Sequence, residues 1–328
     1  MIKSTVIITA YNRTQYLYDA LNSVIKQDNN NLFQIIVAYN FEDSKIDKLM
    51  FENKNIEKLQ YSNESIGYIL AKSIELSQGD IIFFLDDDDE FCINKVEFIQ
   101  SKFEYDPNLI YYHNASLGID EEGNFSNSRM FLSPKKPLII NTSDLSRTLK
   151  TIKKFDSFFN LSSIVVRKKI IQNNLNFLSE IKTNPDNFMF YCAITNKGNI
   201  YIDNVKLTKY RIHESTTQSS NVNEYAKKLI LYYKNSLDSL NKMKLISSKK
   251  ILKNEIFCSQ IRCKINLTFL TDDKYDIKIS ELLLFCRCNY LKHEIRPSYL
   301  VLIYIMYTIN KPLAKSVYNK YKFKFKNT

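Results

Sequence analysis

The first ninety residues alternate two apolar patterns, and this alternation limits the fold more than any other feature of the chain. Four β-branched and apolar runs predict strands buried on both faces. They lie at residues 5–9, 33–38, 56–61 and 80–85. Between them, apolar residues recur at helical spacing over residues 14–27, 46–51 and 65–77. Alternating strands and helices predict an α/β fold, with a doubly wound, mostly parallel sheet flanked by helices.

The end of the fourth predicted strand has the most unusual composition. It is followed without interruption by Asp86, Asp87, Asp88 and Asp89. Four adjacent carboxylates repel one another unless a cation compensates them, and doubly wound sheets bind ligands beyond the carboxyl ends of their strands. The run therefore predicts a site for Mn²⁺ or Mg²⁺, which bind carboxylate and phosphate oxygens. The alternative is a solvated loop that caps a helix beginning near Ile93.

Three fragments of this region resemble a known family. They are VIITAYNR (6–13), NESIGYILAKSIELSQGD (63–80) and FLDDDDEF (84–91). In this order they are similar to the family 2 inverting glycosyltransferases of GT-A fold, over about residues 1–215. The resemblance implies a metal-dependent enzyme of surface-glycan or lipid-linked oligosaccharide synthesis. It would transfer one sugar, with inversion, from a nucleotide-diphosphate-sugar donor to a glycan or lipid-linked saccharide acceptor.

By this resemblance, the first fragment binds the donor nucleotide and the acidic run binds its diphosphate. The implied contacts to the nucleotide base are Thr9, Ala10 and Tyr11. A tyrosine at a strand end can stack on a base. The implied donor contacts in the acidic run are Asp86 and Asp87, with Asp88 as the metal ligand.

The resemblance also assigns residues in the second half of the chain. An inverting transfer needs a general base that takes the proton of the acceptor hydroxyl. The implied base is Asp186 in the segment NPDNFMF, and the alternative is a helix cap. In the extended segment YRIH, Arg211 and His213 point the same way. We expect Arg211 to contact the donor diphosphate, and His213 to bind the metal or the diphosphate.

Acceptor contacts are less clearly marked. Ser162 and Ser163 resemble a family segment near the acceptor, although serines also open strands. His113 lies in a predicted strand and is a further acceptor candidate, with a structural histidine as the alternative.

Two departures from the family pattern leave the donor and the activity open. The aspartate pair that reads the base is absent from residues 39–43, where Asn40 or Asp43 substitutes, and the basic residue of the third loop falls on Leu70. One alternative is therefore a catalytically inactive nucleotide-sugar-binding or scaffold protein of the same fold. A sugar nucleotidyltransferase is another, but it needs a glycine-rich phosphate loop, which residues 10–14 lack.

Beyond the acidic run the pattern changes twice. A helix is expected at residues 186–196, and strands at 109–119, 162–167, 199–203 and 205–212. From about residue 223 onward only helical patterns remain. We therefore expect a GT-A domain over residues 1–220 and a helical C-terminal region over residues 221–328.

The net charge of +11 is concentrated near the C-terminus. No acidic residue follows Glu294, and the basic residues after it are Arg296, Lys311, Lys315, Lys320, Lys322, Lys324 and Lys326. A basic tail behind the apolar run 299–309 suits an anionic membrane surface, with a packed helix and solvated lysines as the alternative. The run is too short to span a bilayer. A basic excess confined to the tail argues against nucleic-acid binding.

The six cysteines form no CxxC pair and no zinc spacing. Their scatter favours reduced, buried thiols in a cytosolic protein. No signal peptide is recognisable at the N-terminus. We expect a cytoplasmic protein, either free or peripheral on the inner face of the cytoplasmic membrane.

Overall fold

The structure, a computed structural model, divides into two compact units, residues 1–213 and 214–328. It describes residues 2–27, 32–127, 132–213, 222–271, 273, 275–288 and 296–322. The boundary predicted near residue 220 falls outside the described residues, so the predicted domain limits stay a prediction.

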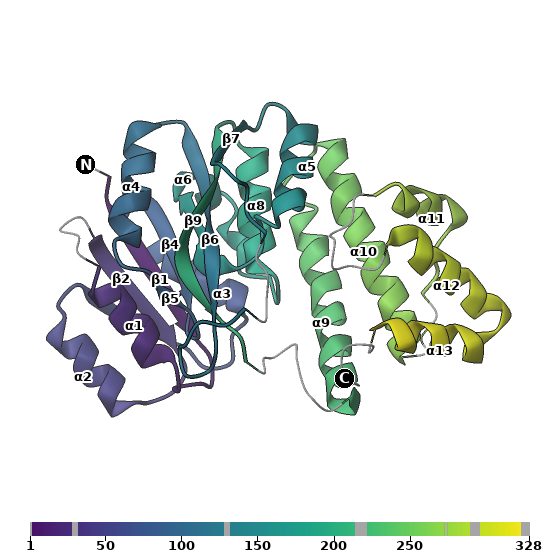
Figure 1. The fold of residues 1–328 in the computed structure, drawn as a ribbon, viewed down its shortest axis with the longest axis horizontal. Helices are drawn as coiled ribbons and strands as arrows, with labels where there is room; N and C mark the ends of the chain where they lie inside the picture. The colour runs from purple at the N-terminus through teal and green to yellow at the C-terminus, as the bar shows by residue number, and fades with distance from the viewer. Residues whose placement is uncertain are drawn as a thin grey trace. The chain divides into compact units, whose positions relative to one another are not determined.

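The N-terminal unit is built on one mixed sheet (Figure 1). Its strands are β1 (Ser4–Ala10), β2 (Leu32–Tyr39), β3 (Ile56–Gln60), β4 (Ile81–Asp86), β5 (Glu90–Phe91), β6 (Leu109–Ile119), β7 (Leu138–Asn141), β8 (Ile164–Arg167) and β9 (Asn199–Arg211). Their order is β3-β2-β1-β4-β8-β6-β9-β5, with β7 beside β9. The first four run parallel, whereas β8 is antiparallel to both of its neighbours.

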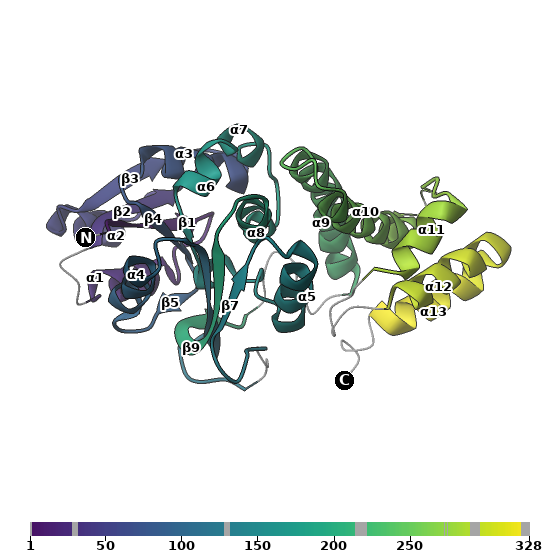
Figure 2. The same cartoon turned by 90° about the horizontal axis from the view of Figure 1, so that it is seen from above.

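Helices cover both faces of this sheet. They are α1 (Leu17–Ile25), α2 (Ser44–Glu52), α3 (Ile66–Leu76), α4 (Lys95–Tyr105), α5 (Leu145–Phe155), α6 (Lys169–Gln172), α7 (Leu175–Leu178) and α8 (Pro185–Thr195). Figure 2 shows α1 and α4 on one face and α3 and α6 on the other. Because strand side chains alternate between faces, Val6 and Ile8 pack toward α1 and α4, with Leu21 and Ile99. The predicted α/β sheet flanked by helices is confirmed.

The central strand β1 aligns the segments that the sequence singles out. Every residue of β1 is buried, as its β-branched composition predicts. In the parallel register, Thr9 lies opposite Asp86 of β4, and Ala10 lies opposite Tyr39 of β2. The carboxyl ends of the three strands therefore meet at one edge, where ligands of such sheets bind.

In the second half of the N-terminal unit, some strands begin or end at other residues than predicted. The strands predicted at 199–203 and 205–212 form one strand, β9. Its pairing with β6 shifts register between His113 and Ala115. This shift marks a bulge at the point where the sequence suggested a break between two strands. The strand predicted from Ser162 begins later, because Leu161–Ser163 form a 3₁₀ turn.

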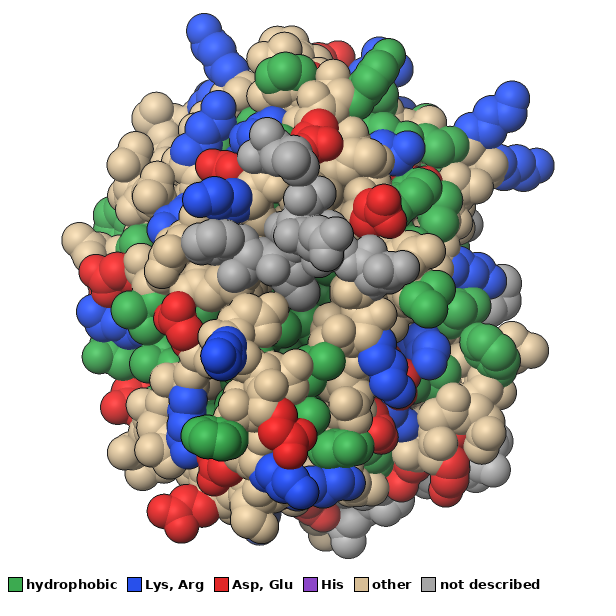
Figure 3. Space-filling model, turned by 90° about the vertical axis from the view of Figure 1, so that its left-hand side faces the viewer, with side chains coloured by type: hydrophobic (Ala, Val, Ile, Leu, Met, Phe, Trp, Pro, Cys, Tyr) green, Lys and Arg blue, Asp and Glu red, His purple; other side chains and the backbone are tan. Residues whose placement is uncertain are grey.

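On the face of the molecule drawn in Figure 3, charged side chains of both signs are interspersed. Lysines and arginines alternate there with aspartates and glutamates. Faces that bind nucleic acid gather basic side chains into a patch or stripe. The described residues on this face form no such patch.

The described elements of the C-terminal unit are helices, as predicted. They are α9 (Val222–Met243), α10 (Lys250–Thr271), α11 (Ile279–Cys286), α12 (Pro297–Ile309) and α13 (Lys311–Lys322). The apolar run predicted as a short helix forms α12, which buries Leu300 and Ile303 in the core of this unit and exposes Leu302 and Ile309. Within the described residues, no helix has both the length and the apolar character needed to cross a bilayer.

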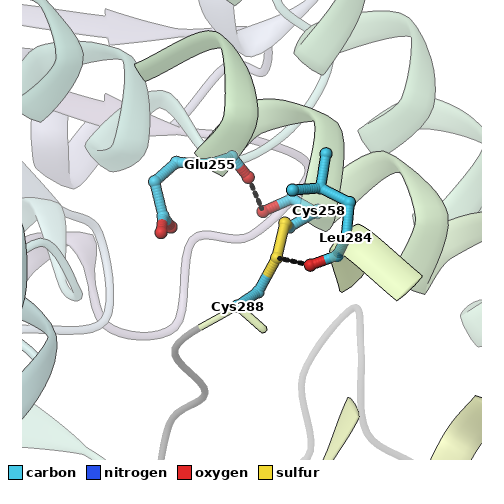
Figure 4. The surroundings of a disulfide bond; sticks show 5 residues. Glu255, Cys258, Leu284 and Cys288 are labelled. Atoms are coloured by element: carbon cyan, nitrogen blue, oxygen red, sulfur yellow. Dashed lines mark hydrogen bonds between the residues drawn. A yellow bond between two sulfur atoms is a disulfide. The ribbon is translucent and has the colours of Figure 1, made fainter. Parts of the chain in front are cut away.

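A disulfide joins Cys258 of α10 to Cys288, just beyond α11 (Figure 4). Their Cα atoms lie 6.4 Å apart, within the usual span of a disulfide. The prediction that all six cysteines are reduced is therefore wrong. The spacing of 30 residues does not reveal a pairing that depends on how α10 and α11 pack. The predicted cytoplasmic location, which assumed reduced thiols, loses that support.

A substitution at Gly67 tests how closely α3 packs against the segment that leads to α8. A Cβ atom added to Gly67 would collide with the backbone carbonyl oxygens of Leu178 and Ile181. Helix propensity alone predicts that Gly67→Ala stabilises the protein by about 1 kcal/mol. We expect the collision to prevail and to lower the free energy of unfolding by about 1–3 kcal/mol.

Urea unfolding measures this change. Lys72→Ala, at an exposed position of the same helix, is the control and should change the stability by less than about 0.5 kcal/mol. A Gly67→Ala protein as stable as the wild type would contradict the close packing.

Candidate active site

The four aspartates form a tight turn at the end of β4, which we call the acidic turn (residues 86–89). Its backbone is tied to neighbouring segments. The N–H of Asp86 donates to Ser162 Oγ at 3.0 Å, and the N–H of Asp87 donates to the Thr9 carbonyl at 3.1 Å. These bonds fix the turn to β1 and to the 3₁₀ turn, so its carboxyl groups have defined directions.

Arg13, three residues beyond β1, binds the side chains of the acidic turn. Its Nε donates to Asp87 Oδ2 at 3.0 Å, and its Nη2 pairs with Asp87 Oδ1 and, at 2.7 Å, with Asp88 Oδ2. Its Nη1 lies 3.1 Å from His213 Nε2. One guanidinium thus contacts three side chains, in a forked geometry that a lysine cannot reproduce.

The structure brings together the two predicted metal ligands, which are 125 residues apart in the chain. His213 Nε2 lies 2.8 Å from Asp88 Oδ2. The ring of His213 packs against Tyr16, with centroids 5.4 Å apart. Tyr16 is buried at the start of α1, so it fixes the imidazole beside the carboxylate.

Arg211 holds the acidic turn from the other side. Its backbone N–H donates to Asp89 Oδ1 at 3.0 Å, and its Nε donates to the Asp88 carbonyl at 2.9 Å. Nη1 reaches the carbonyls of residues 120 and 121, and Nη2 reaches Glu90 Oε1. With 2% of its side chain exposed and every guanidinium nitrogen engaged, Arg211 clamps the turn. The arrangement does not support the predicted contact to the donor diphosphate.

The carboxyl groups of the acidic turn differ in their pKa values. Burial, together with the charge of Asp88, raises the pKa of Asp86 well above its usual range and that of Asp89 to about 8. Burial also raises the pKa of Asp87 to about 6, although Arg13 opposes it. For Asp88, burial acts in the same direction, but His213 and Arg13 outweigh it and lower the pKa. Asp88 is therefore the carboxylate that is most fully ionised near neutral pH.

A buried lysine lies behind the turn. The side chain of Lys95, the first residue of α4, is fully buried. Its Nζ donates to the Ser162 carbonyl at 2.6 Å and to Thr208 Oγ1 at 2.8 Å, and it lies 3.9 Å from the ring centroid of Phe91. Burial lowers its pKa to about 7, and the charge of Asp89 opposes this shift.

The predicted base contacts lie at the carboxyl end of β1, but only one of them is open. Thr9 and Ala10 are buried, and the Ala10 carbonyl accepts a hydrogen bond from the hydroxyl of Tyr61. Tyr11, with 51% of its surface exposed, is the residue of the three that can present a ring to a base. We therefore expect Thr9 and Ala10 to contribute backbone and shape.

Neither proposed substitute for the base-reading aspartate is free. Asn40 exchanges hydrogen bonds with Asn12: its Oδ1 accepts from the Asn12 N–H at 2.8 Å, and its Nδ2 donates to Asn12 Oδ1 at 2.7 Å. Asn12 is held in the left-handed region, with φ of 52°. Asp43 caps α2. Asn40 thus shapes the turn that carries Tyr11, and Asp43 has a structural role.

Asp186 opens α8, after Pro185 at the first helical position. Its Oδ1 accepts a hydrogen bond from the N–H of the next residue, Asn187, at 2.8 Å, within the first turn of the helix. Burial nevertheless raises its pKa to about 7. Its charge also contributes to the raised pKa of Asp86, so it lies within electrostatic reach of the acidic turn. A half-buried carboxyl group with a pKa near 7 is suited to accept a proton.

The predicted acceptor contacts are buried. Ser162 supports the acidic turn, and Ser163 Oγ lies 2.9 Å from Ser116 Oγ. His113 Nε2 lies 2.9 Å from the Phe159 carbonyl, and burial lowers its pKa to about 4, so the ring is neutral. These contacts do not support the acceptor roles predicted for Ser162, Ser163 and His113, because none of the three reaches an open surface.

The donor set at the acidic turn fits a divalent ion that is completed by a ligand. Among the described residues, no three His, Cys, Asp or Glu side chains converge as a metal-binding group. Asp88 and His213 offer one carboxylate and one imidazole beside each other. Mg²⁺ and Mn²⁺ commonly use one or two protein carboxylates and take the remaining ligands from phosphate and water.

Two residues of the site were not predicted from the sequence. Arg13 lies in the fragment VIITAYNR at the carboxyl end of β1, so its position was a usable signal. Lys95 follows the acidic run in a segment that reads as an ordinary helix start. Its burial depends on Ser162 and Thr208, which approach from distant strands, and the sequence carries no sign of this.

Comparison with known families assigns the chain to a family. A model of glycosyl transferase family 2 matches residues 5–172, which include β1, the acidic turn and Ser162. The chain belongs to glycosyl transferase family 2. The predicted resemblance and the GT-A-type fold are thereby confirmed. Asp186 and His213 lie beyond the matched residues.

Curated relatives align with about two thirds of the chain. An uncharacterized glycosyltransferase of Rickettsia bellii is 29% identical over 234 residues, which is 70% of this chain and 31% of the relative. One from Rickettsia felis is 28% identical over 233 residues, with 36% of its own length covered. The chain thus spans about a third of the length of the curated relatives it matches.

Solved structures of S. aureus TarS share the fold. TarS 1–349 superposes with a TM-score of 0.55 at 13% identity, covering 87% of this chain and 78% of that protein. The same protein in complex with UDP-GlcNAc gives a TM-score of 0.56 at 14% identity. At this level of identity, the likeness concerns the fold alone.

The buried Lys95 makes stability depend on pH in a defined direction. Its pKa is about 7 in the folded protein, below the 10.5 expected for an exposed lysine, so the unfolded chain binds more protons between these values. Raising the pH from 7 to 8.5 should therefore stabilise the wild type, relative to Lys95→Met, by about 1.5 kcal/mol.

Urea unfolding of both proteins at the two pH values measures this difference. Lys48→Met, which replaces a lysine with 78% of its side chain exposed, is the matched control. It should follow the wild-type profile. Parallel profiles for the wild type and Lys95→Met would show that Lys95 does not titrate in this range.

Proposed function

We propose that the chain is an inverting glycosyltransferase, which transfers one sugar from a nucleotide-diphosphate-sugar to a glycan or lipid-linked saccharide acceptor. The observation that carries the proposal is the arrangement at one sheet edge in a family 2 chain. Asp88 and His213 lie together there, and Asp186 lies within electrostatic reach of the acidic turn. Tyr11 is exposed at the same edge.

The donor would bind at the carboxyl ends of β1 and β4. The exposed ring of Tyr11 would stack on the nucleotide base, and the turn shaped by Asn12 and Asn40 would hold that ring in place. Asp88 and His213 would hold Mn²⁺ or Mg²⁺, which stabilises the negative charge of a diphosphate leaving group. The clamp of Arg211 keeps the acidic turn rigid, which reduces reorganisation during the reaction.

Asp186 would act as the general base. Its carboxylate takes the proton of an acceptor hydroxyl while that oxygen attacks the anomeric carbon, and the bond from that carbon to the diphosphate oxygen breaks. Attack opposite the leaving group inverts the configuration. A pKa of about 7 keeps Asp186 basic enough to accept the proton and largely ionised above neutral pH.

The proposal also names the partners of the chain. The fold shared with TarS, which has been crystallised with UDP-GlcNAc, makes UDP-GlcNAc the first donor to test. In the C-terminal unit, α12 exposes Leu302 and Ile309, and the basic α13 follows it. We propose that this unit attaches peripherally to an anionic membrane surface at the inner face of the cytoplasmic membrane. Lys324 and Lys326 lie outside the described residues.

A donor screen tests the proposed activity. Purified protein with Mn²⁺ is offered UDP-, GDP- and dTDP-sugars, and the released nucleoside diphosphate is measured. We expect turnover or slow hydrolysis of one donor, abolished by EDTA and reduced at least 100-fold in Asp88→Asn, because a group that stabilises the leaving group is lost. Asp19→Asn, at an exposed position of α1, is the control and should keep full activity.

Other outcomes of the screen separate the rival functions. Donor binding without turnover, in the presence of a range of saccharide acceptors, would favour an inactive nucleotide-sugar-binding protein. Release of pyrophosphate from a nucleoside triphosphate and a sugar phosphate would identify a nucleotidyltransferase. Failure to bind any donor would contradict the glycosyltransferase proposal.

The proposed base gives a pH dependence. Because Asp186 must be ionised to accept a proton, kcat/KM should rise about tenfold per pH unit below pH 7 and level off above it. Above pH 7, Asp186→Asn should lower kcat by about 10²–10⁴-fold and leave donor binding intact, and the difference from the wild type should shrink as the pH falls. A flat profile between pH 5.5 and 7.5, with donor binding unchanged, would exclude Asp186 as the base.

A further inference from the structure

Arg13 contacts the two groups that would bind a metal. Its Nη2 lies 2.7 Å from Asp88 Oδ2, and its Nη1 lies 3.1 Å from His213 Nε2. The same Asp88 oxygen lies 2.8 Å from His213 Nε2. Arg13 therefore contacts one of the two carboxylate oxygens of Asp88 and the ring nitrogen of His213, the two groups that would bind a divalent ion.

A metal and Arg13 compete for these groups. A divalent ion bound to Asp88 and His213 would place two positive charges beside the guanidinium, and like charges repel strongly in a partly buried site. His213 Nε2 must also give up any proton that it shares with Asp88 before its lone pair can bind a metal. The guanidinium and the ion therefore do not contact Asp88 together.

Arg13 has the most exposed side chain of this group of four. Its side chain is 29% exposed, whereas those of Asp87 and His213 are 7% exposed. The contact with Asp87 can remain while Nη2 leaves Asp88, because Nε also donates to Asp87. A guanidinium released from Asp88 would stand at the edge where the diphosphate is expected, and it binds phosphate oxygens readily.

We propose that Arg13 is an internal counter-ion of the acidic turn, which a divalent metal must displace from Asp88 and His213 and which the donor's diphosphate then accepts. The inference rests on the proposed function, because it assumes that these two residues are the metal ligands. Its consequence is that metal binds weakly to the free protein and more strongly when a diphosphate is present to take up Arg13.

The test is a titration of the 328-residue protein with Mn²⁺ alone, with free Mn²⁺ followed by electron paramagnetic resonance. We expect Arg13→Gln to bind Mn²⁺ at least tenfold more tightly than the wild type, because the competing charge is gone. The double variant Arg13→Gln, Asp88→Ala should lose this gain. Arg147→Gln removes an arginine from α5, outside the site, and should bind like the wild type, which controls for net charge.

Circular dichroism and thermal unfolding establish that each variant is folded. If Arg13→Gln does not fold, Arg13→Lys replaces it: a single ammonium cannot contact Asp87, Asp88 and His213 together, so Mn²⁺ binding should still tighten. Folded variants that bind Mn²⁺ no more tightly than the wild type would overturn the proposal. Turnover measured in the donor screen is independent of this result, so failure of the counter-ion and failure of the enzyme are distinguishable.

Discussion

Compensation of the negative charge at the end of β4 is the interaction on which the rest of the site depends. Four aspartates lie at the end of a buried strand, and burial raises the pKa of Asp86, Asp87 and Asp89, so protonation removes part of their charge. Arg13, from the end of β1, pairs with Asp87 and Asp88, and the charge of Lys95 in α4 lowers the pKa of Asp89. Arg211 of β9 binds Asp89 through its backbone N–H and the Asp88 carbonyl through its Nε, while its guanidinium pairs with Glu90. The turn is therefore formed jointly by both halves of the N-terminal unit, and its geometry requires that β1, β4 and β9 are assembled.

The three cations have different roles because their surroundings differ. Arg211 is buried, and its nitrogens are saturated by protein acceptors, so it fixes the backbone of the turn. Lys95 is buried deeply enough to lose much of its charge near neutral pH, and it joins the Ser162 and Thr208 segments beneath the turn. Arg13 alone of the three has a side chain that is partly open to solvent. A residue that exchanges one partner for another needs such a partly exposed side chain.

The sequence predicts which edge of the sheet carries the site, because the alternation of strands and helices and the acidic run are both local patterns. It also predicts Asp88 and His213, through resemblance to a family. It does not predict which side chains of a motif face the ligand. Arg211 and His213 both lie against Tyr16, as their spacing suggests. The guanidinium of Arg211, however, donates hydrogen bonds to the carbonyls of residues 120 and 121 and is not directed at a ligand.

Burial explains why the structure gives little support to the predicted acceptor contacts. Ser162 and Ser163 matched a family segment, but the 3₁₀ turn places both inside the protein. His113 was predicted with a structural role as the alternative, and its contact with Phe159 agrees with that alternative. The Cys258–Cys288 disulfide escaped prediction for a related reason, since it depends on the packing of two helices and not on the spacing of the cysteines.

The two carboxylates with proposed chemical roles have pKa values that are shifted in opposite directions, although burial is the largest influence on both. Asp88 is bound by His213 and Arg13, which lower its pKa. Asp186, within the described part of the chain, accepts hydrogen bonds from backbone N–H groups, and the charge of Asp156 adds to the rise in its pKa that burial causes. A pair of acidic groups whose environments separate their pKa values can divide the work of ligand and base. The absence of a cation beside Asp186, in its described surroundings, therefore matters as much to the proposed chemistry as the presence of Arg13 beside Asp88.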